Sequence, residues 1–152
     1  MRALLVAVAL TAAAATAQAA ADTERLRELH EKVMRAHRHG DVELILQDEG
    51  DEYVVASRGE ITRPSLEQRR ERLGPYLRST TFEFYRDAVP PLVTVSRDGT
   101  LGWAVVQVEA RGIRKTATGA TEPVEFVSAW IEMYAKRDGK WLRVGNVSNF
   151  KP

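Results

Sequence analysis

The chain has 152 residues, of which 44% are hydrophobic and 28% are charged, and its formal net charge at pH 7 is +1. No block of basic residues stands out, so the composition offers no electrostatic case for binding nucleic acid or anionic lipid. The absence of cysteine excludes disulfides, thiolate catalysis and cysteine-based metal sites.

The first twenty residues have the three regions of a secretory signal peptide. Arg2 supplies a positive start, residues 4–10 an apolar centre, and residues 17–19 a small-residue cleavage pattern. The pattern predicts cleavage between Ala19 and Ala21, and a buried N-terminal helix is the alternative. The apolar stretch is too short, and too rich in Ala and Thr at its end, for a strong membrane span.

Residues 22–152 are expected to form one domain in the periplasm or outside the cell, with no membrane attachment after cleavage. Removing residues 1–20 takes away one basic residue, Arg2, and leaves 21 basic and 21 acidic residues. The mature domain is therefore expected to be neutral. Because it has no disulfide, the packing of its core must stabilise it.

Two helices are predicted at the start of this domain. From Thr23 to His39 apolar residues recur at helical spacing, and Asp22 or Thr23 is placed to cap the first turn. Asp41 is placed to cap a second, short helix over residues 42–47. A turn is expected over residues 48–51, before the first strand.

A third helix is predicted to begin after Ser65 and to run to about Leu73. Ser65 and Gln68 have the spacing of a capping box, and Gly74-Pro75 are expected to close the helix. Strands are expected at residues 53–57, 82–87, 93–97 and 101–111, with two more in a closing hairpin over residues 124–150. Helices gathered early and strands late indicate an α+β fold, with the helices on one face of an antiparallel sheet.

The closing hairpin turns at Asp138-Gly139, a dipeptide that favours the left-handed backbone of a type I′ turn. A regular two-residue loop predicts that Ile131 lies opposite Asn146 and Ala129 opposite Ser148, with both polar residues on one largely aliphatic face. The other face is expected to carry Trp130, Glu132, Tyr134, Trp141, Arg143 and Val147. Since neither face is fully polar, the hairpin is expected at the centre of a sheet that is covered on both sides.

Several of these features together resemble the nuclear transport factor 2-like superfamily, and within it the SnoaL-like group. They are the end of the first helix at residues 36–41, the strand over residues 54–57 with Gly59, and residues 138–141 followed by Ser148. The resemblance covers nearly all of the mature chain. Its motifs mark the fold more than any activity.

The resemblance implies a cone, in which a strongly curved sheet wraps around the helices and a pocket opens between them. Members include steroid isomerases, polyketide cyclases, dehydratases, epoxide hydrolases and non-catalytic binding or assembly domains, so the fold alone does not define the activity. An isomerase of this type needs a carboxylate base beside a proton-donating Tyr and a protonated acid. The regular register places Ile131 and Ala129, not acids, opposite Asn146 and Ser148, which argues against that set.

His30 and His37 are candidate pocket residues at the border of the apolar stripe of the first helix. They lie seven residues apart and so project from the same side. Either could act as a general acid or base or contact a ligand, and the alternative is a half-buried His bonded to the sheet. Their axial separation of about 10 Å rules out one shared metal ion. His37 and His39 with Asp41 form a loose metal-like cluster at a helix end, which is interpreted as a solvated terminus because His and Arg there suit the helix dipole. No metal site and no cofactor is predicted.

Asn146 and Ser148 are polar residues on an otherwise apolar hairpin face. They are expected either to bond neighbouring elements or to line a wet pocket. Tyr76, just beyond the third helix, and Trp103, on a central strand, are candidates for the mouth of the pocket, with plain core packing as the alternative. The arginines within residues 69–72 are interpreted as a solvated helix face.

Three functions remain open. The preferred hypothesis is an exported protein that holds a small, largely apolar molecule in the cone. The first alternative is a small lyase, isomerase or hydrolase that uses His30 or His37 as general base. The second is an oligomerisation module without a ligand, for which the cone should be filled.

A homodimer is also predicted. If the face with Asn146 and Ser148 lines the cone, then the face with Trp130, Tyr134 and Trp141 is the outer one. Aromatic residues on an exposed sheet face are typical of an interface, so a second copy is expected to cover them. The alternative is that the two faces are reversed and these aromatic side chains fill the cone.

Overall fold

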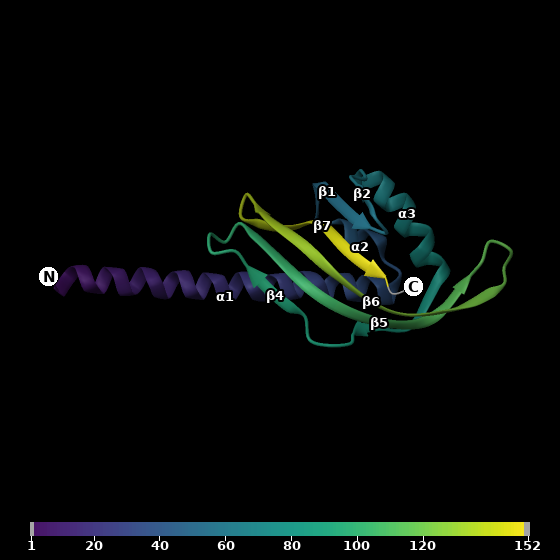
Figure 1. The fold of residues 1–152 in the computed structure, drawn as a ribbon, viewed down its shortest axis with the longest axis horizontal. Helices are drawn as coiled ribbons and strands as arrows, with labels where there is room; N and C mark the ends of the chain where they lie inside the picture. The colour runs from purple at the N-terminus through teal and green to yellow at the C-terminus, as the bar shows by residue number, and fades with distance from the viewer. Residues whose placement is uncertain (1, 151–152) are drawn as a thin grey trace.

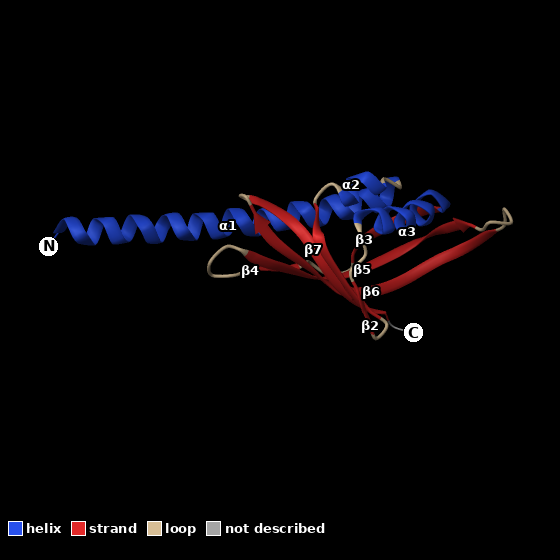
Figure 2. Cartoon of the chain, turned by 90° about the horizontal axis from the view of Figure 1, so that it is seen from above, coloured by secondary structure: helices blue, strands red, loops and turns tan. Residues whose placement is uncertain are grey.

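The computed structural model describes residues 2–150 as one curved sheet with three helices on one side of it (Figures 1 and 2). The helices are α1 (Arg2–His39), α2 (Val42–Leu46) and α3 (Leu66–Ser79). The strands are β1 (Glu49–Ser57), β2 (Glu60–Thr62), β3 (Thr80–Asp87), β4 (Leu92–Val95), β5 (Leu101–Lys115), β6 (Thr121–Arg137) and β7 (Lys140–Phe150). The sheet has the order β2-β1-β7-β6-β5-β3, with β4 paired to β5. The α+β class and the central place of the closing hairpin are confirmed.

Helix α1 continues without a break through the point where a cap was expected. The Asp22 carboxylate does not cap a helix; it accepts hydrogen bonds from Lys136 Nζ at 2.6 Å and from Trp141 Nε1 at 2.8 Å. Before Asp22, residues 16–21 are exposed, and α1 extends well beyond the sheet in that direction (Figure 1). In the part of the chain that the structure describes, no helix is long and apolar enough to cross a membrane.

The two short helices follow their predicted caps. Leu44 N donates to Asp41 Oδ1 at 3.0 Å, and both hydrogen bonds of the capping box between Ser65 and Gln68 are present. The predicted end of α3 at Gly74-Pro75 is wrong, because the helix runs on to Ser79. Pro75 removes one backbone donor, but Leu77, beyond it, is buried against α1 and α2 and holds the last turn in place.

The sheet is mixed, so the expectation of a wholly antiparallel sheet is wrong. β1 pairs with β7 in parallel, and the other strand pairs are antiparallel. β1 begins at Glu49, so most of the residues expected to form a turn are strand instead. This parallel pair joins the first strand to the last one, which no local pattern in the sequence encodes.

A bulge in the closing hairpin reverses the predicted faces of its last residues. Tyr134 pairs with Arg143, but Met133 pairs with Gly145, so Val144 is an extra residue on β7. Gly145 is suited to this place because a Cβ there would lie 2.4 Å from the Val54 carbonyl oxygen. Beyond the bulge the side chains of Asn146, Val147 and Ser148 point to the opposite face from that of a regular hairpin.

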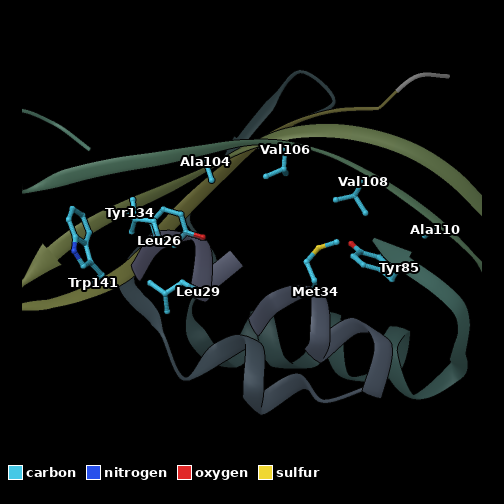
Figure 3. Packing of buried hydrophobic residues seen from close by; sticks show 10 residues of the cluster. All are labelled: Leu26, Leu29, Met34, Tyr85, Ala104, Val106, Val108, Ala110, Tyr134 and Trp141. Atoms are coloured by element: carbon cyan, nitrogen blue, oxygen red, sulfur yellow. The ribbon is translucent and has the colours of Figure 1, made fainter. Parts of the chain in front are cut away.

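The main core lies between α1 and the inner face of the sheet. Leu26, Leu29 and Met34 of α1 lie over the valines and alanines of β5 (Figure 3). Tyr134 and Trp141 close one end of this core and are 1% and 3% exposed. The predicted outward orientation of these two aromatic side chains is therefore wrong. They point inward because Leu26 and Asp22 of α1 lie directly against their face of the sheet.

The outer face of the sheet carries a continuous line of aliphatic side chains. Leu92, Val105, Ile131 and Val147 are register neighbours across β4, β5, β6 and β7. We call these four residues the outer apolar row; their exposed fractions are 70%, 37%, 37% and 41%. The expectation that helices or other elements cover both faces of the hairpin is wrong for this chain, because all three helices lie on the inner side.

Candidate functional site

A cavity of about 430 Å³ opens between the helices and the inner face of the sheet. Its walls come from α1, α2, α3 and from strands at both ends of the sheet. Apolar side chains line much of it, namely Val33, Ile45, Val55, Leu73, Val124 and Phe126. This volume is in the range of small-molecule sites.

Four of the six predicted site residues line this cavity, namely His37, Tyr76, Asn146 and Ser148. His30 does not line it; the side chain is 2% exposed and lies behind the cavity, between α1 and the sheet. Trp103 does not line it either. Its partners Thr94 and Met133 are on the outer side with it, so its prediction as a mouth residue is wrong. Alternation along β5 puts Trp103 outward because Ala104 and Val106 face the core.

Asn146 and Ser148 line the cavity, but the bulge at Val144 puts them on the opposite face of the hairpin from the predicted one. They face inward beside Glu132 and Trp130, their register partners, and not beside Ile131 and Ala129. The argument that no acid lies opposite Asn146 is therefore wrong. Ser148 Oγ donates to Ser57 Oγ at 2.9 Å, whereas the Asn146 side chain has no hydrogen-bond partner among the described residues.

A chain of alternating charges, buried except for the half-buried Asp87 at one end, runs beneath and beside the cavity. It links α1, β3, β6, β7, β1 and α3, and it contains three acidic and three basic side chains. In order these are Asp87, His30, Glu132, Arg143, Glu49 and Arg69. We call this set the buried ion chain. It has no net charge when His30 is protonated, which is the condition under which so many buried charges can be tolerated.

His30 is the link between α1 and two strands. Nδ1 lies 3.1 Å from Glu132 Oε2 and Nε2 lies 3.0 Å from Asp87 Oδ1. Burial opposes the charged form of the ring, but the hydrogen bonds and charges of both carboxylates outweigh it and raise the pKa of His30 from 6.5 to about 10. His30 is therefore an imidazolium that donates from both nitrogens at neutral pH, and it has no lone pair with which to act as a base.

Glu132 is fully buried and ionised. Burial alone would raise its pKa, but the hydrogen bond and charge of His30, with the charge of Arg143, lower it from 4.5 to about 2. Tyr134 Oη donates to Oε2 at 2.6 Å and Trp130 Nε1 donates to Oε1 at 3.1 Å. With its lone pairs taken up by these donors, Glu132 is a fixed anion and a poor proton acceptor.

The other half of the buried ion chain ties α3 to the sheet. Arg143 NH2 donates to Glu49 Oε1, and Arg69 Nε lies 2.7 Å from Glu49 Oε2. Arg69 also donates to the carbonyls of Pro64 and Gly50. The guanidinium of Arg69 lies over the Tyr53 ring, 4.5 Å from its centroid. Arg69 is 1% exposed, so its interpretation as part of a solvated helix face is wrong.

His37 has the opposite electrostatic character to His30. Nδ1 donates to the Val33 carbonyl at 2.8 Å, and the ring stacks on Tyr85 with centroids 4.3 Å apart. Burial, with the charge of Arg143 as a smaller contribution, lowers the pKa of His37 from 6.5 to about 4. The ring is neutral at physiological pH, and Nε2 is then an acceptor with no partner among the described residues.

The sequence reasoning missed the ionic floor of the cavity, formed by Glu49, Arg69, Glu132 and Arg143. Glu132 and Arg143 were placed on one hairpin face among aromatic side chains, and that mixture was the available signal. Charged residues within an aromatic strand face are paired when the face is buried. Among the described residues, no group of His, Cys, Asp or Glu side chains is suited to hold a metal ion.

Fold and cavity together define the class of protein: a single sheet curved around helices that leaves a pocket with an ionic floor. No family model matches the sequence, and no curated protein sequence matches it significantly. Solved structures do match the fold. A nuclear transport factor 2-like protein with a cystatin-like fold from Novosphingobium aromaticivorans has a TM-score of 0.67 and 21% identity over 93% of this chain and 89% of its own.

Two further structures give the same result. A nuclear transport factor 2-like superfamily protein from Salmonella enterica has a TM-score of 0.68 and 15% identity, covering 88% of this chain and 93% of its own. A ketosteroid isomerase-like protein from Erwinia carotovora has a TM-score of 0.65 and 14% identity, covering 86% and 98%. The chain has the nuclear transport factor 2-like fold, as the sequence predicted. Identities this low establish the fold and not the chemistry.

Proposed function

We propose that the protein binds a small molecule with an apolar body in the cavity. The observation that carries the proposal is a cavity with apolar walls in which His37 Nε2 and the Asn146 amide have no hydrogen-bond partner among the described residues. Hydrogen-bonding groups in such a position are satisfied by water or by a ligand. The open cavity also favours a binding role over a module that only assembles, for which a filled cone was expected.

Substitution of Asn146 by Leu tests this proposal. Leu has a similar volume, so the substitution removes the amide and leaves the cavity shape almost unchanged. We expect it to weaken ligand binding at least about tenfold, the effect of losing one or two buried hydrogen bonds, while the melting temperature of the free protein changes little. Ser57→Ala is the matched control, because it also removes a polar group from the cavity wall. Since the Ser57 hydroxyl is already bonded to Ser148, this variant should weaken ligand binding less than Asn146→Leu does. A loss of stability without a change in binding would contradict the proposal.

A second candidate is an enzyme in which His37 is the general base. Its specific support is the unprotonated Nε2 inside the cavity, held by the Nδ1 bond to Val33. His30 cannot take this role, because both nitrogens are bonded to carboxylates. A solved neighbour described as ketosteroid isomerase-like makes proton abstraction beside a carbonyl a suitable first reaction to assay. Turnover that His37→Gln abolishes and His30→Gln only weakens would establish this candidate.

Export is part of the proposal. The support is the three-region pattern of residues 1–20, together with the exposure of residues 16–21 and the buried contacts of Asp22 that follow them. Removal of the leader leaves the Asp22 contacts with Lys136 and Trp141 intact. Mass spectrometry of the protein recovered from the periplasm or medium should show an N-terminus near residues 20–22, and an intact Met1 there would contradict export.

We also propose a homodimer. Its interface is the outer apolar row and not the hairpin face with Trp130, Tyr134 and Trp141, because that face is turned inward. The row crosses four strands without an acidic or basic member, and a twofold axis through it would place the same aliphatic side chains against each other. Contiguous exposed apolar patches are typical of protein–protein interfaces.

A further inference from the structure

The charges around the cavity are unevenly distributed between its floor and its mouth. The floor is the buried ion chain, in which three anions balance three cations. Two more guanidinium groups line the cavity, those of Arg72 on α3 and Arg114 on β5. Among the described residues that line the cavity, the only carboxylates are Glu49 and Glu132, and both belong to the buried ion chain. Arg72 and Arg114 therefore add positive charge that the floor does not neutralise.

These two arginines differ in their existing partners. Arg114 NH2 donates to Glu122 at 2.9 Å, and both side chains are about half exposed. Exposed pairs of this kind are weak and exchange readily with other anions. Arg72 is exposed, and it makes no ion pair with any residue in the described part of the chain. An anion at the mouth would find one free guanidinium and one that is easily released.

Tyr76 lines the same cavity as the two arginines. Arg72 and Tyr76 are four residues apart on α3, so both project from the same face of the helix. Burial raises the pKa of the Tyr76 phenol, and the charge of Arg114 is near enough to oppose that rise. Figure 1 shows α3 at the same end of the molecule as the β5–β6 turn, and Arg114 is the second-last residue of β5, just before that turn. Two guanidinium groups and one phenol hydroxyl, all hydrogen-bond donors, thus surround the mouth of the cavity.

The interior has the opposite character. Apolar side chains such as Val33, Leu73 and Phe126 line its walls, and the acceptor Nε2 of His37 has no partner there among the described residues. The cations of the floor, Arg69 and Arg143, are already paired with Glu49 and Glu132, so an anion at that depth would find no unpaired cation among the described residues. The charge on a ligand therefore belongs at the mouth, and its apolar part belongs inside.

We infer that the ligand is an amphipathic organic acid, held with its carboxylate between Arg72 and Arg114 and with its apolar body in the cavity. This inference rests on the proposed binding function and narrows it to a class of ligand. Guanidinium groups bind carboxylates through charge-assisted hydrogen bonds, which Tyr76 can supplement. A donor at the buried end of the ligand, such as a hydroxyl group, would complete the site by bonding His37 Nε2.

Calorimetric titration with a matched pair of probes tests the inference. We would use 4-phenylbutanoate and 4-phenylbutan-1-ol, which share an apolar body and differ in the charge of one end. At low ionic strength the acid is expected to bind about tenfold more tightly than the alcohol, an increment typical of hydrogen bonds to a charged group. Added salt should reduce the difference, because the mouth is open to solvent.

Arginine variants test whether the preference for the acid over the alcohol arises at the mouth of the cavity. Arg72→Gln and Arg114→Gln are each expected to weaken binding of the acid severalfold and to leave the alcohol unchanged, and the double variant should show no preference. Arg70→Gln is the matched control, because Arg70 is on the same helix but pairs with Glu43 and Glu67 outside the cavity. It removes the same charge and should leave the preference intact. Thermal melts would verify that each variant is folded.

The outcomes separate the two proposals. If the acid and the alcohol bind equally to the unmodified protein, or if Arg70→Gln changes the preference as much as Arg72→Gln does, the inference about the acid is wrong while the binding function stands. If neither probe binds at millimolar concentration, both the acid inference and the proposed binding of apolar molecules are contradicted.

Discussion

His30 on α1 and Glu132 on β6 are 102 residues apart in the sequence and are joined by a hydrogen bond of 3.1 Å between Nδ1 and Oε2. Neither side chain is more than 2% exposed. Each explains the ionisation of the other: the carboxylate raises the pKa of His30, and the imidazolium lowers the pKa of Glu132. The pair fixes the first helix on the sheet at the place where the cavity begins.

Glu132→Gln is expected to destabilise the protein strongly. Without the Glu132 carboxylate, the buried positive charges of His30 and Arg143 are only partly compensated. Breaking a buried ion pair in this way costs about 3–5 kcal/mol of folding free energy. Glu125→Gln, on the same strand, removes an exposed partner of Arg111 and should change the free energy of unfolding by less than about 0.5 kcal/mol. Urea denaturation of both variants measures the difference. Equal stabilities would show that Glu132 is uncharged in the folded protein.

His30 should make the protein less stable at alkaline pH. Its folded pKa, about 10, is above the ordinary value of 6.5, so its contribution is complete below pH 6.5 and is lost as the pH rises towards 10. The free energies of unfolding of the unmodified protein and of His30→Gln should therefore converge over that range, by an amount on the order of a few kcal/mol. A constant difference between pH 6.5 and 10 would contradict the protonated state of His30.

His37 should make the protein less stable at acid pH. Its folded pKa, about 4, is below the ordinary value, so the unfolded chain takes up a proton first as the pH falls from 6.5 to 4. His37→Asn, which retains a donor for the Val33 carbonyl, should lose less stability than the unmodified protein over this range. Nitrogen NMR of the ring offers a direct check, since a protonated His37 at pH 6 would exclude the unprotonated Nε2 acceptor.

A charged substitution in the outer apolar row tests the homodimer. Ile131→Glu places a carboxylate at the centre of the row and should give a folded monomer, whereas the unmodified protein should scatter light as a dimer at micromolar concentration. Trp130→Glu is the contrasting variant: Trp130 lines the cavity and donates to Glu132, so this change should destabilise the fold. An unmodified protein that is monomeric under these conditions would remove the case for a dimer.

Local sequence patterns predicted many of the elements because their causes are local. The Asp41 cap, the capping box of Ser65 and Gln68, and the turn at Asp138-Gly139 depend on residues within four positions of one another, and the structure has all three. Asp138 and Gly139 both have positive φ, at 50° and 77°. The end of α3 was misjudged because Pro75 is tolerated where the following turn is packed.

The candidate site was only partly predictable, because its electrostatics depend on distant partners. His30 and His37 look alike in the sequence, yet one is protonated by Asp87 and Glu132 and the other is kept neutral by burial. Only folding brings α1 against β3 and β6 and so separates their roles. Arg69 likewise looked like a surface residue, and its burial follows from Glu49 at the start of β1.

The sequence by itself determined the class of fold, the helix caps and the presence of a central hairpin, since periodicity and turn chemistry act over a few residues. The tertiary structure alone decided which side of the sheet Asn146 and Ser148 occupy. That outcome depends on one extra residue, Val144, and on the close approach of Gly145 to β1, the strand that pairs in parallel with β7. Because side chains alternate along a strand, a shift of one residue exchanges the faces, and here it places two polar side chains inside the cavity.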